Sequence, residues 1–352
     1  MARILVTGAA GLIGGEVSAR LVARGHAVTA LIHLAREPRA NDGSAIPSAP
    51  WGQPVCDAIT LLQGDLTRER FGLGEAVWRD LAARHDRVVH CAAVTDFDAD
   101  PALYRAVNVE GTARVLDLAQ EGGMAVVQVS TAYVCGTREG WIGEDAVQPD
   151  SYTNGYEASK AAAEDLVRGS AAPWVIARPS IVVGDHTHGV LRSFDTIYTV
   201  LKLFAEGLIR TMPARADATL DLVPIDHVAR GLVSLVEQAD ALAGGTFHLV
   251  SARPMPVAAF TRVLGRYPAL SCPRFVSPEA FAVATLSPLE RRYHERIGAL
   301  YGSYFSRAPR FDDARFRAAT GLVPPPVDDD WYERLVDHCL AVGFLRPCRS
   351  VA

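Results

Sequence analysis

The sequence lacks the features that mark several large classes of protein. Its 352 residues hold six cysteines with no CxxC pair or other metal-ligand spacing, so we expect neither a disulfide framework nor a metal site. No apolar run reaches the roughly 18 to 20 residues of a membrane span, and glycines interrupt the apolar N-terminus, unlike a signal peptide. The net charge of -5 lacks the basic excess of nucleic-acid binders. These absences favour a cytoplasmic protein with reduced thiols, no membrane span and no nucleic-acid partner, and they leave the oligomeric state open.

Short apolar runs alternate with helical patterns through the first half of the chain. Helical periodicity begins at Leu12, at Glu75, at Asn108 and at Tyr156. The predicted strands occupy residues 4–7, 27–32, 59–62, 87–91, 125–130 and 174–179. Such alternation indicates βαβ units and a parallel sheet covered on both faces. The sequence therefore predicts a doubly wound, Rossmann-type α/β fold.

The pattern changes after Gly184. A long helical pattern covers 191–209, one further strand is predicted at 246–251, and the chain from Pro254 onward reads as mainly helical. We expect a nucleotide-binding domain of residues 1–184 plus about 220–251. A smaller, mainly helical C-terminal lobe of about 185–219 and 252–352 would bind substrate. Residues 36–54, rich in Pro, Ala, Ser and Gly, predict a long, mobile loop.

The stretch VTGAAGLIGG places Gly8, Gly11 and Gly14 between the first predicted strand and the first predicted helix. Glycine permits a tight turn and close approach of the backbone to a pyrophosphate, while the helix N-terminus offers free N–H groups. The alternative is a purely structural glycine turn. The strand-turn-helix context favours a dinucleotide site.

Cofactor choice depends on the end of the second strand, where a carboxylate would hold the ribose 2'-hydroxyl of NAD. That strand ends with His33 and Arg36, and no carboxylate precedes Glu37. NADPH is therefore favoured, unless Arg36 is a solvated loop residue. Asp65, after the third strand, could accept a hydrogen bond from the adenine amino group or cap the next turn.

The stretch GYEASKAAAED sets Tyr156 four residues before Lys160. Residues at i and i+4 lie on one helix face, so a phenol and an ammonium could converge there. Hydride arriving at a carbonyl carbon leaves an alkoxide that needs a proton donor. A nearby ammonium would lower the phenol pKa from about 10. The alternative is a core tyrosine followed by a solvated lysine.

An ordered set of motifs resembles the extended short-chain dehydrogenase/reductase family. It comprises TGAAGLIG at 7–14, GDL at 64–66, HCAAV at 90–94, NVEGT at 108–112, VSTAYV at 129–134, Tyr156 with Lys160, RPSIVVG at 178–184 and VPIDHVA at 223–229. The resemblance implies Thr131, Tyr156 and Lys160 as catalytic residues, with Ser130 the less favoured hydroxyl. It implies these cofactor-binding residues: Gly8, Gly11, Leu12, Ile13, Gly14, His33, Arg36, Asp65, Leu66, Ala92, Ala93, Asn108, Lys160, Pro179 and Ile181.

Within that family, four stretches look like the thioester reductases and fatty acyl-CoA reductases, the male-sterility subgroup. They are ITLLQGDLTRERFGL, HDRVVHCAAVTDF, VSTAYV and RPSIVVGDHTHG. The resemblance implies NADPH-dependent reduction of an acyl thioester to an aldehyde or alcohol. No adenylation or carrier segment is recognisable, so we expect delivery in trans, as a coenzyme A thioester or on a separate acyl carrier protein. The alternatives are a reductase of a free ketone or aldehyde, a sugar-nucleotide epimerase or dehydratase, and a non-catalytic NADP-sensing protein.

Two further clusters carry weaker signals. His186 and His188 have no third partner at a metal-ligand spacing and read as loop residues. Five arginines are interleaved with aromatics, namely Arg291, Arg292, Arg296, Arg307 and Arg310. This pattern favours the solvated face of an amphipathic helix over a docking site for an acidic carrier protein or the phosphates of coenzyme A.

Overall fold

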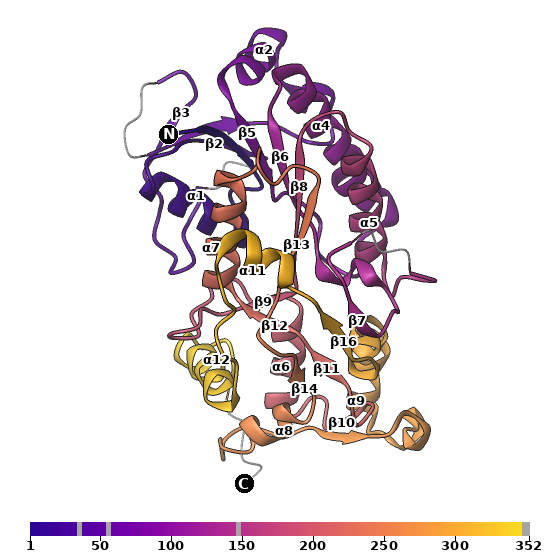
Figure 1. Ribbon diagram of the computed structural model, residues 1–352. Coiled ribbons are helices and arrows are strands. Elements are labelled where there is room, and N and C mark those ends of the chain that lie inside the picture. The colour runs from indigo at the N-terminus through magenta and orange to yellow at the C-terminus, as the bar shows by residue number, and fades with distance from the viewer. Residues whose placement is uncertain (34–36, 54–57, 146–148, 347–352) are drawn as a thin grey trace.

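The computed structural model describes residues 1–33, 37–53, 58–145 and 149–346. Figure 1 shows a central sheet flanked by helices, with a second group of helices below it. The main sheet has eight strands in the order β13-β8-β6-β5-β1-β2-β4-β3, and every pairing is parallel. The strands are β1 Arg3–Thr7, β2 Ala27–Ile32, β3 Ser48–Pro50, β4 Ile59–Gln63, β5 Arg87–His90, β6 Ala125–Val129, β8 Trp174–Pro179 and β13 Gly245–Leu249. The predicted doubly wound Rossmann-type fold is confirmed.

Both faces of this sheet are buried, as is usual for a parallel sheet covered by helices on both sides. Ile4 and Val6 of β1 point to one face, where α1 (Leu12–Ala23) and α7 (Ile225–Glu237) pack. Leu5 points to the other face, which α2 (Glu75–Arg84), α4 (Glu110–Gly122) and α5 (Gly155–Arg168) cover. Alternate side chains of one strand therefore supply two separate cores.

The strand order reverses at β1, which lies between β2 and β5. Thr7 and His90 are paired where β1 and β5 end. In open parallel sheets, ligands bind outside the carboxyl ends of the strands at such a switch point. The turn after β1 and the segment after β5 are thus placed to form a site together.

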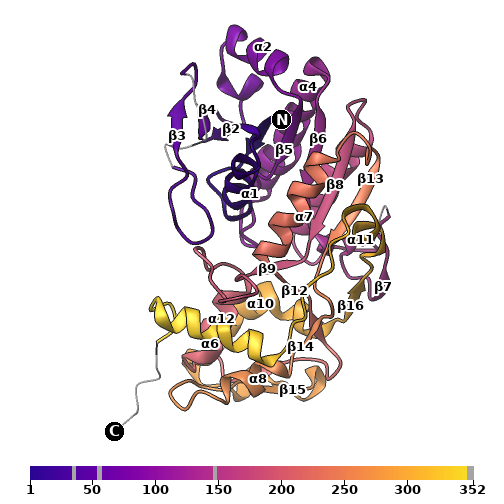
Figure 2. The same ribbon diagram turned by 60° about the vertical axis from the view of Figure 1, so that its left-hand side comes forward.

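Below the sheet lies a group of elements that we call the C-terminal lobe. Its helices are α6 Ile197–Ala205, α8 Ala259–Leu264, α9 Pro288–Tyr293, α10 Ala299–Tyr301 and α12 Asp329–Ala341. Two short strand pairs complete it, β10 Thr211–Pro213 with β15 Arg274–Val276, and β11 Thr219–Leu220 with β14 Met255–Pro256. β9 Ile181–Val183 pairs with β12 Leu222–Pro224 and connects the lobe to the sheet (Figures 1 and 2).

The chain returns from this lobe to the sheet before its final helix. β16 (Pro309–Phe311) pairs with β7 (Gly140–Ile142), and α11 (Ala314–Thr320) contacts α7 and β13. A four-residue helix, α3 (Pro101–Tyr104), precedes the π-helical turn Arg105–Val109. The other 3-10 or π-helical turns are Glu69–Gly72, Ala132–Cys135, Pro278–Ala280, Val283–Thr285, His294–Gly298 and Gly302–Ser306. Among the described residues, no helix is both long enough and apolar enough to cross a membrane.

Two predictions of local structure were wrong. The segment predicted as a loop holds β3, a Ser-Ala-Pro edge strand of poor propensity that forms because it pairs with β4. The helix predicted over 191–209 is only α6, because Thr196 has a φ of 46° and cannot be helical. The segment after Pro254 is mainly helical, as predicted, and it also contains the short strands β14, β15 and β16.

Candidate active site

A cleft of about 430 Å³ lies between the carboxyl ends of the sheet strands and the C-terminal lobe, within the size range of ligand sites. Its lining includes Gly8, Gly11, Leu12, Ile13, Gly14, Ala93, Pro179 and Ile181, all predicted for the cofactor. Thr131 and Tyr156 line the same cleft. The structure thus brings the predicted cofactor turn and two of the predicted catalytic residues to one cavity.

The glycine turn is compact, and two of its positions have no room for a side chain. Gly8 has a φ of 67°, and a Cβ on it would lie 2.6 Å from the backbone nitrogen of Ala92. A Cβ on Gly14 would lie 2.3 Å from the carbonyl oxygen of Gly8. α1 begins after Gly11 with no side-chain cap and no acidic residue in its first turn. Its N–H groups are therefore available to an anion such as a pyrophosphate.

His33 and Asp65 lie together at the ends of β2 and β4, with 3.6 Å between the His33 Nε2 and an Asp65 carboxylate oxygen. The other Asp65 oxygen accepts hydrogen bonds from the backbone nitrogen and the hydroxyl of Thr67, at 2.9 and 2.7 Å. Asp65 therefore caps the turn, which was the alternative reading. Neither His33 nor Asp65 lines the cleft. Arg36 lies outside the described residues.

Asn108 and Leu66 also lie behind the cleft wall. The Asn108 side chain accepts from the backbone nitrogen of Val94 at 2.7 Å and donates to the Val94 carbonyl at 3.0 Å and the Ser159 hydroxyl at 2.8 Å. It thereby fixes the segment after β5 against α5. Leu66 is buried against Gly111 at the start of α4.

α5 presents Tyr156 to the cleft from its first turn. The Asn154 side chain caps this helix by accepting from the backbone nitrogen of Glu157 at 2.9 Å. The Tyr156 ring stacks on Phe97, with ring centroids 5.8 Å apart. Burial raises the pKa of Tyr156, while hydrogen bonding with the Thr131 side chain acts in the opposite direction. The predicted lowering of this pKa by a nearby ammonium was wrong.

Lys160 explains that difference. Its side chain is buried, and its Nζ donates to the Val129 carbonyl at the end of β6, at 2.7 Å. Burial lowers the pKa of Lys160 to about 8, although the nearby Glu164 and Cys91 favour the charged form. The ammonium is thus held by a backbone carbonyl, and it is not among the groups that shift the pKa of Tyr156.

Thr131 lies at the end of β6 and caps the turn Ala132–Cys135, where its hydroxyl accepts from the backbone nitrogen of Tyr133 at 3.2 Å. Its hydroxyl hydrogen is left to donate elsewhere. Ser130, the less favoured hydroxyl, lines the cleft as well.

Arg192 was missed in the sequence because it lies where a helix was predicted. Its Nη2 donates to the carbonyls of Ala10, at 3.2 Å, and Gly11, at 2.5 Å. Its Nε is buried without a hydrogen-bond partner among the described residues. Of the described residues that line the cleft, Arg192 is the one with a cationic side chain. It therefore supplies positive charge beside the glycine turn.

The arginine pattern does not form one surface. Arg307 is 4% exposed and pairs with buried Glu157 at 2.9 Å, so neither predicted reading describes it. Arg292, Arg296 and Arg310 are exposed.

His186 and His188 lie in the loop after β9. The His186 ring contacts the carbonyl of Pro326, and His188 lies 3.8 Å from Asp185. No cluster of three or more potential metal-ligating side chains occurs in the described part of the chain.

Residues 6–232 match the family model described as male sterility protein. Glycine betaine reductase ATRR of Emericella nidulans is 27% identical over 72% of this chain and 21% of its own length. Isonitrile lipopeptide synthase of Streptomyces coeruleorubidus is 27% identical over 97% of this chain and 25% of its own. The chain thus spans about a quarter or less of these relatives.

Solved structures show the same fold. The terminal R domain from the myxalamid PKS-NRPS biosynthetic pathway has a TM-score of 0.80 at 24% identity, covering 99% of this chain and 93% of that one. A thiolation-reductase di-domain from an archaeal non-ribosomal peptide synthetase has a TM-score of 0.72 at 18% identity, covering 98% and 76%. The family model spans well over half of the sequence. The chain therefore belongs to the male sterility protein family of NAD(P)-dependent oxidoreductases, which has the extended short-chain dehydrogenase/reductase fold.

Proposed function

We propose that this chain is an NADPH-dependent reductase of an acyl thioester, acting through Thr131, Tyr156 and Lys160. The observation that carries the proposal is that Thr131 and Tyr156 line the same cleft as the glycine turn. A proton donor and a hydroxyl therefore lie within one cavity with a site suited to a dinucleotide.

The residues present fit such a cofactor. The glycine turn is so tight that a Cβ on Gly8 or Gly14 would meet backbone atoms, α1 offers its N-terminus beside it, and the Arg192 Nε has no hydrogen-bond partner among the described residues. Gly8, Gly11, Gly14 and Arg192 would hold the pyrophosphate, and Lys160 would hold the nicotinamide ribose. When bound, NADPH supplies a hydride to the substrate carbonyl carbon.

The side chains of this chain supply the remaining chemistry. Thr131 donates a hydrogen bond that orients the carbonyl oxygen and stabilises the oxyanion. Tyr156, kept protonated by its raised pKa, gives its proton to that oxygen, which yields a hemithioacetal. Cleavage of the C–S bond, with transfer of the hydroxyl proton to sulfur, releases an aldehyde and a thiol. Lys160, with a pKa of about 8, can pass a proton at little energetic cost near neutral pH.

The thioester assignment draws on the relatives. One similar structure joins a thiolation domain to a reductase, and another is a terminal R domain of a PKS-NRPS pathway. We infer a carrier-bound acyl group as the substrate class, with a coenzyme A thioester as the second source. A free ketone or aldehyde is the alternative substrate of the same side chains.

The test is NADPH oxidation by the purified protein with acyl-carrier and acyl-coenzyme A thioesters, beside free ketones and aldehydes. Thiol release in step with NADPH oxidation supports the proposal, and product mass distinguishes aldehyde from alcohol. Activity confined to free carbonyls would reject the thioester assignment and leave the roles of the side chains in place.

The preference for NADPH over NADH is also part of this proposal. Its support is the sequence after β2, which runs from His33 to Arg36 with no carboxylate before Glu37. We expect Arg36→Ala to weaken binding of NADPH more than binding of NADH. An equal effect on the two cofactors would contradict a role for Arg36 at the 2'-phosphate.

A further inference from the structure

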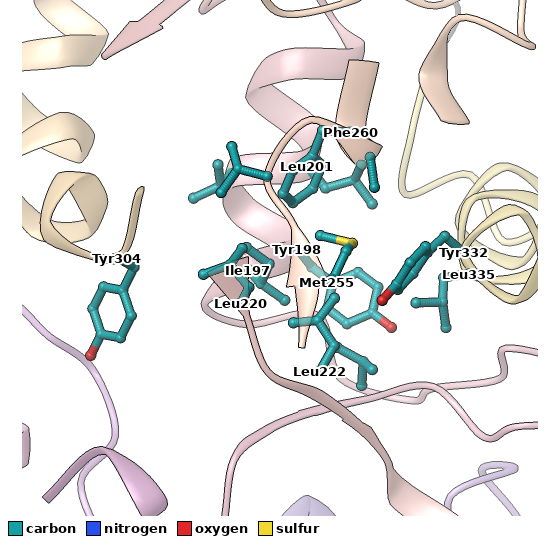
Figure 3. Close-up of a cluster of buried hydrophobic side chains, with 14 of the residues drawn as sticks. Ile197, Tyr198, Leu201, Leu220, Leu222, Met255, Phe260, Tyr304, Tyr332 and Leu335 are labelled. Atoms are coloured by element: carbon teal, nitrogen blue, oxygen red, sulfur yellow. The ribbon is translucent and has the colours of Figure 1, made fainter. Parts of the chain in front are cut away.

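Beside the cleft, the C-terminal lobe contains a second cavity of about 40 Å³ (Figure 3). Thirteen buried residues line it, contributed by α6, α8, α12 and the strands β9, β12 and β14; eleven are apolar and two are tyrosines. The Tyr198 hydroxyl already accepts a hydrogen bond from the backbone nitrogen of Gly184 at 2.9 Å. Because a buried water needs two to four polar partners, this lining favours an apolar occupant.

Ile197 separates the two cavities, since its side chain lines both of them. In the view of Figure 3, Ile197 and Leu220 lie between Tyr304 on one side and Met255 with Tyr332 on the other. Tyr304 and Leu220 line the cleft, whereas Met255 and Tyr332 line the second cavity. Displacement of Ile197 would therefore connect the cleft with the apolar cavity.

The position of Ile197 in α6 permits such a movement. It is the first residue of the helix, so no preceding helical turn restricts its χ1 angle as it would in a helix interior. Thr196, directly before it, has a φ of 46° and a ψ of -106° and also lines the cleft. A β-branched residue in that region is strained, and such strain is found at ligand clamps and switch regions.

We propose that the second cavity receives the distal methylenes of a straight, apolar acyl chain whose carbonyl lies at Thr131 and Tyr156, with Ile197 displaced to admit it. The inference rests on the proposed function, because it assumes an acyl group in the cleft. The cavity has room for about three water-sized groups, hence about two or three methylenes. Each buried methylene strengthens binding about fourfold.

Two neighbouring alanines provide a matched pair of variants. Ala259 is buried and lines the cavity from α8, whereas Ala258 is exposed. Ala259→Leu fills the cavity, and Ala258→Leu adds the same atoms on the solvent side. The probes are S-alkyl pantetheine thioethers, butyl through dodecyl, which cannot be reduced. Binding is measured by calorimetry, and the melting temperature of each variant confirms folding.

In the wild type, affinity should rise about fourfold per methylene until the cavity is full. In Ala259→Leu the rise should stop about two or three methylenes earlier, and Ala258→Leu should follow the wild type. If Ala259→Leu does not fold, Ala259→Val and Ile197→Phe replace it, with the same early stop expected. Identical chain-length series for a folded cavity variant and for Ala258→Leu would overturn the inference, as would no binding at any length.

Turnover with the matching acyl pantetheine thioesters separates the two proposals. Binding that responds to Ala259→Leu without reduction of any thioester would support the cavity assignment and reject the proposed function. Thioester reduction with a chain-length preference that Ala259→Leu leaves unchanged would support the function and reject the cavity assignment.

Discussion

Arg307 donates to Glu157 across a buried ion pair that joins the segment before β16 to the first turn of α5. The Arg307 Nη2 lies 2.9 Å from a Glu157 carboxylate oxygen, and the Tyr304 hydroxyl donates to the same oxygen at 2.6 Å. The guanidinium also lies over the Tyr304 ring, 4.3 Å from its centroid. Glu157 directly follows Tyr156, so this pair fixes the wall of the cleft to the helix that carries the proposed proton donor.

Removal of Arg307 should therefore lower the free energy of unfolding. Arg307→Met leaves the Glu157 carboxylate buried without its counter-charge, and such losses cost about 3–5 kcal/mol. We expect a fall of this size in the free energy of unfolding measured in urea. The control is Arg215→Met, since Arg215 pairs with Glu139 at the surface, where a pair contributes about 0–1 kcal/mol. Equal losses in the two variants would contradict the structural role of the buried pair.

The sequence predicted the fold because every main-sheet strand except β3 coincides with a short run rich in apolar or β-branched residues. It also predicted that the glycine turn and Tyr156 would lie at one cleft, because each belongs to a motif that adopts one local geometry. Arg192 and Arg307 could not be found in this way. Arg192 meets the glycine turn from a loop about 180 residues away along the chain, and Arg307 is buried by a carboxylate 150 residues away. Spacing along the chain carries no information on such contacts.

Lys160 illustrates a subtler limit. The i, i+4 spacing correctly places it on the helix that carries Tyr156. Spacing did not reveal that the Val129 carbonyl accepts a hydrogen bond from Lys160 or that burial outweighs the nearby charges in setting the Lys160 pKa. The direction of a pKa shift depends on the surroundings in three dimensions, so the predicted effect on Tyr156 failed although the helix was right.

Tyr156→Phe tests the proton donor without removing the ring that stacks on Phe97. We expect turnover to fall about 10²- to 10⁴-fold, with the dissociation constant of NADPH nearly unchanged in fluorescence titration. Tyr152→Phe is the matched control, because Tyr152 is exposed and lies just before the helix that carries Tyr156. Retention of full turnover by Tyr156→Phe would remove it from the mechanism.

The lowered pKa of Lys160 predicts an alkaline limit to activity. If Lys160 binds the cofactor as the charged ammonium, binding should weaken as that form is lost, when the pH rises through about 8. The pH profile of kcat/KM for NADPH, which reports groups of the free enzyme, should therefore fall above about pH 8. The Lys160→Arg variant should be slower at every pH, but its kcat/KM should not fall above about pH 8, since arginine stays charged. If kcat/KM of Lys160→Arg fell in the same pH range, the titration would belong to another group.

Arg192 should act on the cofactor through charge. If its guanidinium binds the pyrophosphate, Arg192→Gln loses a charge-assisted hydrogen bond of about 1.5–3 kcal/mol, so NADPH should bind about 10- to 100-fold more weakly. Adenosine 2'-monophosphate has no pyrophosphate, and its affinity should be unchanged in the same calorimetric titration. Arg310→Gln, which removes an exposed arginine, controls for net charge and should leave both affinities unchanged. If Arg192→Gln weakened both ligands equally, Arg192 would act by stabilising the glycine turn through the Ala10 and Gly11 carbonyls, and the pyrophosphate would be held by α1 alone.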